Sequence, residues 1–122
     1  MMIELTAADG HVLQAYAVGP KDAKKGVVVV QEIFGLNKHM RRIADDFAKR
    51  GYAVVMPALF DRVERGIELG YEAADVARGR ELRGMINEHK TLLDVLAAAA
   101  ALPAGAKRGI VGYCWGGTVA WH

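Results

Sequence analysis

A run of four consecutive valines, at residues 27–30, is the feature that most restricts how this chain can fold. β-branched side chains favour extended backbone, and the run begins directly after Gly26. An unbroken apolar run of this length fits a strand that is buried on both faces, as the strands of parallel sheets are. The run therefore predicts one strand of a parallel sheet.

Extended segments are predicted on both sides of the valine run. Residues 2–6 and 11–18 alternate weakly between apolar and polar side chains. Asp9-Gly10 between them favours a hairpin turn, because glycine accepts a positive φ. Residues 52–57, YAVVMP, predict a further strand that ends at its proline, since proline cannot donate a ladder hydrogen bond.

Helical patterns separate and follow these strands. Residues 38–50 place apolar side chains at every third or fourth position, which predicts a helix with Asn37 as its N-cap and Gly51 as its stop. Residues 58–70 carry scattered charges and glycines, and we expect them to be irregular. A long helical region is predicted from residue 72 to residue 102.

A break is expected in the first half of this long region, because Gly79 and Gly84 weaken it. One face of the region is expected to gather Met85, Ile86, His89, Leu92, Leu93 and Leu96. Residues 109–112 predict a short strand, and a helical pattern begins again at Thr118. The order hairpin, strand, helix, strand, helix, strand, helix predicts one α/β domain over residues 1–122, with a mostly parallel sheet flanked by helices.

Composition and charge argue against several kinds of partner. The net charge of +2, from 16 basic and 14 acidic residues, gives no reason to expect nucleic acid or a membrane. The single cysteine cannot form an internal disulfide, and no Cys-x-x-Cys pair suggests redox chemistry or a thiolate metal site. Glu4 interrupts the apolar run that a signal peptide needs. We therefore expect a soluble, cytoplasmic domain with no metal and no cofactor.

The sequence GYCWGG, residues 112–117, follows a predicted strand and opens a predicted helix. This is the setting of a nucleophile elbow, G-x-nucleophile-x-G, with Cys114 as the nucleophile. The strand must reverse into a helix within one turn, so Gly112 and Gly116 avoid collisions that larger side chains would cause, and Gly117 is the third glycine of the elbow. The free N–H groups at the start of the helix favour a thiolate and stabilise an oxyanion.

Other interpretations of these residues stay open. A lone cysteine is more often a buried and inert side chain. A phosphate-cradling loop is the weaker alternative, because the motif lacks the Lys and Ser/Thr of a Walker sequence. Glu32 follows the valine strand at the edge where ligands bind in open α/β sheets, so a functional role is expected for it. Its alternative role is that of a solvated loop carboxylate.

Two segments of this chain resemble the dienelactone hydrolase family, the cysteine members of the α/β-hydrolase fold. They are residues 27–62, which contain QEIFG, and residues 109–117, which contain GYCWGG. The resemblance covers essentially all of this chain and about the first half of a usual member. It implies a hydrolase that acts on a small carboxylic ester or lactone through an acyl-thioester intermediate.

The resemblance also implies roles for individual residues. Cys114 is the expected nucleophile, and Glu32 of QEIFG is expected to take the proton of the thiol when substrate arrives. The backbone N–H groups of Ile33 and Trp115 form the expected oxyanion hole.

The resemblance does not assign two arginines and three histidines to the site. Members of the family hold a substrate carboxylate with an arginine from the region before the long helix, where Arg78 and Arg80 stand, and either of these is as well explained as an exposed helix arginine. His122 falls two helical turns after the elbow, so we do not expect it to be the catalytic histidine. We expect His39 to be a solvated residue at a helix start and His89 to be a core residue.

Two hypotheses about function follow from the short stretch after the nucleophile. The family's catalytic acid and histidine follow the nucleophile in chain order, but only residues 115–122 follow it here, and none of them is an aspartate. The first hypothesis is a hydrolase whose acid and histidine come from an absent segment or a partner chain, so that residues 1–122 alone have little turnover. The second is a truncated, catalytically incomplete fragment that forms homo-oligomers through an exposed strand edge and apolar faces.

Overall fold

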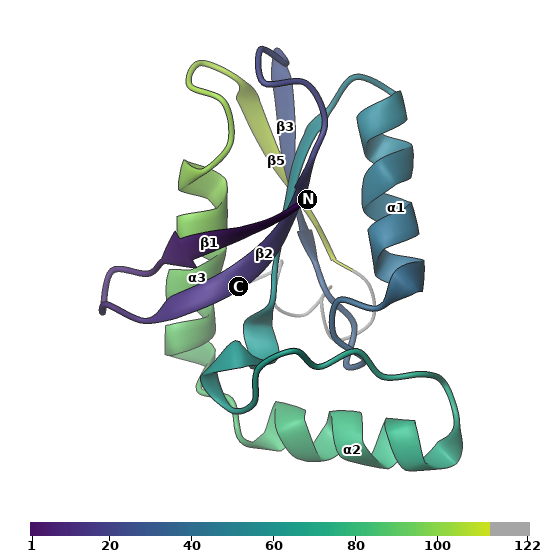
Figure 1. Ribbon diagram of the computed structural model, residues 1–122. Helices are drawn as coiled ribbons and strands as arrows, with labels where there is room; N and C mark the ends of the chain where they lie inside the picture. Colours follow the sequence, from purple (N-terminus) through teal and green to yellow (C-terminus); the bar gives the residue numbers. More distant parts are fainter. Residues whose placement is uncertain (113–122) are drawn as a thin grey trace.

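The computed structural model describes residues 1–112, which form a five-stranded sheet with helices on both faces (Figure 1). The strands lie in the order β1-β2-β4-β3-β5. β3 pairs in parallel with β4 and β5, whereas β2 pairs antiparallel with β1 and β4. The α/β fold is confirmed, as a mixed sheet in which a hairpin extends three parallel strands. The strand bounds are Met2–Thr6 (β1), Val12–Val18 (β2), Lys25–Val30 (β3), Ala53–Pro57 (β4) and Lys107–Gly112 (β5).

The hairpin of β1 and β2 is formed as predicted. Gly10 in its turn has a φ of +89°. The N–H of Gly10 donates to the carbonyl of Ala7 at 2.9 Å, and the N–H of Ala7 donates to the carbonyl of His11 at 2.8 Å. A residue with a Cβ would be strained at this φ, which explains why glycine occupies this position of the turn.

β3 is buried on both faces, which confirms the interpretation of the valine run. Its even-numbered valines pack into a core cluster with α3 (Glu88–Ala100), and its odd-numbered valines pack into a second cluster with α1 (Lys38–Lys49). Full burial of a valine side chain contributes about 1.5–3 kcal/mol relative to exposure. The four valines therefore join the two helical layers through the sheet.

α1 begins and ends where the sequence predicts. The side chain of Asn37 accepts a hydrogen bond from the N–H of Met40 at 3.1 Å, which caps the helix. Gly51, with a φ of +93°, follows the C-terminal end. Met40 and Ala44 are buried against the sheet, so the apolar stripe faces the core.

The long helical region is divided into α2 (Ala73–Gly84) and α3, and the break follows Gly84 directly. The prediction of which residues form the buried apolar face of this region is wrong. Leu96 is 56% exposed, and His89, expected in the core, is exposed as well. The buried face of α3 instead consists of Thr91, Asp94, Val95 and Ala98.

A salt bridge explains why a carboxylate lies on the buried face of α3. The segment expected to be irregular contains a short 3-10 helix, η1 (Leu59–Arg62). From its end, Arg62 donates to both oxygens of Asp94 at 2.8 Å and also pairs with Asp9 in the hairpin turn at 2.8 Å. The charge at Asp94 is thus neutralised inside the fold, and this pairing overrides the apolar periodicity.

Candidate functional site

The carboxyl ends of β3 and β5 meet at one edge of the sheet (Figure 1). The last residues paired between these strands are Val30 and Gly112. Glu32 follows Val30 by two positions in the chain, so the structure brings it to the edge where β5 also ends. Of the predicted elbow, only Gly112 is described. The remainder lies outside the described residues: Cys114, Trp115, Gly116 and Gly117.

Gln31 gives the loop after β3 its shape. Its side chain is fully buried. The amide oxygen accepts from the backbone N–H of Leu59 at 2.8 Å, and the amide nitrogen donates to the carbonyl of Glu32 at 3.1 Å. The N–H of Gly35 also donates to that carbonyl at 3.3 Å, which closes a turn. The backbone around Glu32 is therefore held by the loop's own hydrogen bonds and by the segment that follows β4.

Residues 67–71 hold the same loop from another direction. The N–H of Leu69 donates to the carbonyl of Phe34 at 2.8 Å, and the ring of Tyr71 packs edge-on against the ring of Phe34 with centroids 4.6 Å apart. The side chain of Asn37 donates to the carbonyl of Leu69 at 2.9 Å. No sequence pattern predicts these contacts, because they join groups that are distant in the chain.

Glu32 and Ile33 are both half-buried in this loop. Ile33 packs against the core cluster on the α3 side of the sheet. Within residues 1–112, the carboxylate of Glu32 forms neither a hydrogen bond nor a salt bridge. A carboxylate with no committed partner can accept a proton, which is the chemistry expected of Glu32.

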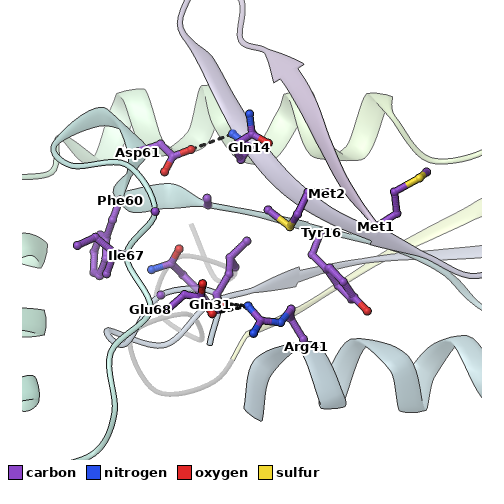
Figure 2. A pocket seen from close by; sticks show the side chains of 14 residues that line it. Met1, Met2, Gln14, Tyr16, Gln31, Arg41, Phe60, Asp61, Ile67 and Glu68 are labelled. Atoms are coloured by element: carbon purple, nitrogen blue, oxygen red, sulfur yellow. Dashed lines mark hydrogen bonds and ion pairs between the residues drawn. The ribbon is translucent and has the colours of Figure 1, made fainter. Parts of the chain in front are cut away.

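A pocket of about 400 Å³ opens on the α1 side of the sheet (Figure 2). Its wall is mostly apolar, and neither Glu32 nor Ile33 lines it. Several of its polar groups are partnered: Arg41 pairs with Glu68 at 2.6 Å, and the hydroxyl of Tyr16 donates to Asp45 at 2.7 Å. The hydrogen bond to Asp45 raises the pKa of Tyr16 above its ordinary value. Gln31 and Gly35 of the loop after β3 do line it, so the pocket borders the candidate catalytic loop without including Glu32 or Ile33.

The arginines of α2 are not distinguished as carboxylate-binding groups. Arg78 already pairs with Glu64 and Glu81, and Arg80 is exposed. His39 is exposed at the start of α1, in agreement with its expected solvated position. His122 lies outside the described residues.

Residues 1–112 contain no group of three or more His, Cys, Asp and Glu side chains that could hold a metal ion. Over the same described part of the chain, no helix has the length and hydrophobicity needed to cross a membrane.

The family model and the relatives found by sequence agree on one family. A sequence model of the dienelactone hydrolase family matches residues 13–122. The carboxymethylenebutenolidase of Pseudomonas putida is 33% identical over 124 residues, which cover 97% of this chain and 52% of the relative. The carboxymethylenebutenolidase homolog of Rattus norvegicus is 36% identical over 115 residues, which cover 90% of this chain and 45% of the relative.

The likeness extends to solved structures. A crystal structure named "Putative Dienelactone Hydrolase", from Klebsiella pneumoniae, matches with a TM-score of 0.76 and 29% identity, over 99% of this chain and 52% of that chain. This chain thus spans about half the length of the relatives that it matches.

Proposed function

Because this chain belongs to the dienelactone hydrolase family, we propose that it provides the nucleophilic half of a hydrolase for small carboxylic esters or lactones, with Cys114 as the nucleophile. Family membership implies a small-molecule substrate. Relatives are named carboxymethylenebutenolidase, and a butenolide is an unsaturated lactone. A cyclic ester of this kind is the substrate class that we assign to the whole protein.

The proposed chemistry is acyl transfer through a tetrahedral intermediate. Glu32 takes the proton of Cys114, and the thiolate sulfur forms a bond to the carbonyl carbon of the substrate. The carbonyl oxygen becomes an oxyanion, which accepts hydrogen bonds from the N–H groups of Ile33 and Trp115. The intermediate then expels the alkoxide, which takes up a proton, and leaves an acyl thioester. Hydrolysis of that thioester by water regenerates the thiol.

The observation that supports this proposal most is the parallel pairing of β3 with β5. The pairing ends at Val30 and Gly112, and each proposed reactive residue follows one of these two by two positions in the chain. Reactive groups in open α/β sheets gather at the carboxyl ends of neighbouring strands. A second supporting observation is that the carboxylate of Glu32 forms neither a hydrogen bond nor a salt bridge within residues 1–112.

The proposal is tested with a small activated aryl ester. Residues 1–122 should release about one equivalent of phenolate per chain, and mass spectrometry should find the acyl group on Cys114. Cys114→Ala should abolish this release, and Glu32→Gln should slow it by about 10²–10⁴-fold. Release by Cys114→Ala at the rate of the unchanged chain would refute the assignment.

The number of turnovers separates two versions of the proposal. One equivalent without further turnover assigns the hydrolytic step to the part of the relatives that this chain does not cover. Many equivalents would mean that residues 1–122 hydrolyse their own thioester. The alternative hypothesis, a fragment that associates through a strand edge, gains no support from the comparisons.

A further inference from the structure

We infer that Gly79 and Tyr71 are positioning residues for the N–H of Ile33: Gly79 lies against the carbonyl of Ile33, and Tyr71 packs on the ring of the next residue, Phe34. This inference rests on the proposed function, because Ile33 matters for catalysis only if its N–H receives an oxyanion. Neither residue is proposed to touch the substrate. Their effect is transmitted through the backbone of the loop that follows β3.

The contact of α2 with this loop is possible only because residue 79 has no side chain. α2 lies across the end of the sheet, beyond the carboxyl end of β3 (Figure 1). Gly79 is buried, and a Cβ built on it would be 2.4 Å from the carbonyl oxygen of Ile33 and 3.2 Å from its carbonyl carbon. Real Cβ atoms essentially never approach another heavy atom within 3.0 Å. The obstructing atoms belong to the backbone, so they cannot rotate aside as the end of a long side chain can.

The position of Gly79 in α2 makes this contact informative. Glycine is the least helix-favouring residue apart from proline, yet it stands in the middle of this helix. Only Gly79 and Leu82 of α2 are buried, so the helix docks through a narrow strip centred on the Ile33 contact. Gly84 ends the same helix, and a Cβ built on it meets nothing within 4 Å. Gly84 is therefore a matched control for Gly79.

The neighbours of Ile33 in the chain are also fixed, which prevents the loop from absorbing a push. The carbonyl of Glu32 accepts hydrogen bonds from Gln31 and Gly35, and the carbonyl of Phe34 accepts one from residues 67–71. The ring of Tyr71 packs on the ring of Phe34. The N–H of Ile33 lies in the peptide group that it shares with the carbonyl of Glu32. A displacement of the Ile33 carbonyl must therefore move Ile33 against that group and strain the hydrogen bonds that orient its N–H.

An oxyanion donor acts only within a narrow range of distance, about 2.7–3.1 Å from the oxyanion. A shift of several tenths of an ångström should therefore slow acyl transfer. Alkylation of the same thiol by iodoacetamide forms no oxyanion, because the thiolate displaces iodide from a saturated carbon. The two reactions of Cys114 thus separate the positioning of Ile33 from any general change in the thiol or in the fold.

The experiment compares the two rates in Gly79→Ala and Gly84→Ala of the full chain. For Gly79→Ala we expect acylation by the activated ester to fall by about 10–100-fold, and alkylation to stay within about twofold. For Gly84→Ala we expect both rates to be unchanged. A folded Gly79→Ala that acylates normally would overturn the inference, and so would an equal loss of both rates.

A second pair of variants tests the contact of Tyr71 with Phe34, the residue after Ile33, and it decides the matter if Gly79→Ala does not fold. Tyr71 is 55% exposed, so its loss should leave the fold intact. Tyr71→Ala should slow acylation without slowing alkylation, and Tyr71→Phe, which keeps the ring on Phe34, should restore the acylation rate. Normal acylation by Tyr71→Ala would overturn the positioning role inferred for Tyr71. Failure of the proposed function is recognised separately, because Cys114→Ala would then acylate as fast as the unchanged chain.

Discussion

Loss of Arg62 should destabilise the fold more than loss of its buried partner, Asp94. The side chain of Asp94 is fully buried, whereas that of Arg62 is 12% exposed. Arg62 also holds Asp9, so it keeps a carboxylate partner when Asp94 is removed. Asp94 has no other cation among its salt bridges in residues 1–112, so removal of Arg62 leaves a negative charge inside the fold.

The size of each effect follows from this asymmetry. Arg62→Met keeps most of the aliphatic stem but leaves the carboxylate of Asp94 unpaired, which should cost about 3–5 kcal/mol. Asp94→Leu removes the buried charge together with the salt bridge and should cost about 1–3 kcal/mol. The double variant has no buried unpaired charge, so its free energy of unfolding should lie close to that of Asp94→Leu alone.

Urea unfolding of the four proteins, followed by far-UV circular dichroism, measures these free energies. The reasoning also applies if Arg62→Met is largely unfolded without urea, because the double variant should then recover a cooperative transition. A loss below about 1 kcal/mol for Arg62→Met would refute it. Additive losses in the double variant would refute it as well, since two coupled charges cannot contribute independently.

Three further predictions concern the same fold. The hydrogen bond from Arg62 lowers the pKa of Asp9 from 3.8 to about 2. The stability that ionised Asp9 contributes is therefore complete above pH 3.8 and is lost as the pH falls towards 2. Asp9→Asn should flatten the decline of the unfolding free energy over that range, and an unchanged decline in the variant would contradict this. Asn37→Ala should lower the free energy of unfolding by about 0.5–2 kcal/mol, and by more than Asn87→Ala does. Both side chains cap a helix, but only that of Asn37 also bonds to residues 67–71. Equal thermal stabilities of the two variants would argue against that added role. Gln31→Met keeps the size of the side chain but leaves a buried N–H unpaired, so urea unfolding should show a loss of about 1–3 kcal/mol, and no loss would mean that the N–H finds another acceptor.

Much of the fold could be predicted because its signals are local. The valine run, the Gly10 turn and the Asn37 cap each determine the conformation of a few neighbouring residues, and all three are confirmed. The buried face of α3 was not predictable from periodicity, because it depends on a salt bridge between Arg62 and Asp94 that closes only in the folded chain.

For the candidate site too, the features set by local sequence could be predicted and those set by distant contacts could not. The placement of Glu32 after β3 follows from where an apolar strand ends, and the structure agrees. Its catalytic role, like that of Cys114, stays a prediction. The support of Ile33 by Gly79 could not be predicted, because a glycine in a helical pattern signals only weakness until the backbone that approaches it is known.

The position of β5 in the sheet has a consequence for the time at which the candidate site forms. β1, β2, β3, α1 and β4 are consecutive in the chain and contact one another, so they can assemble from short loops. β5 pairs with β3 across a separation of more than eighty positions, and closing such a long loop is slow. We therefore expect the sheet to gain its last strand late in folding and late in synthesis on the ribosome. In this order of events the loop that carries Glu32 forms before β5 docks. The sheet edge on which the reaction is proposed is complete only when β5 pairs with β3.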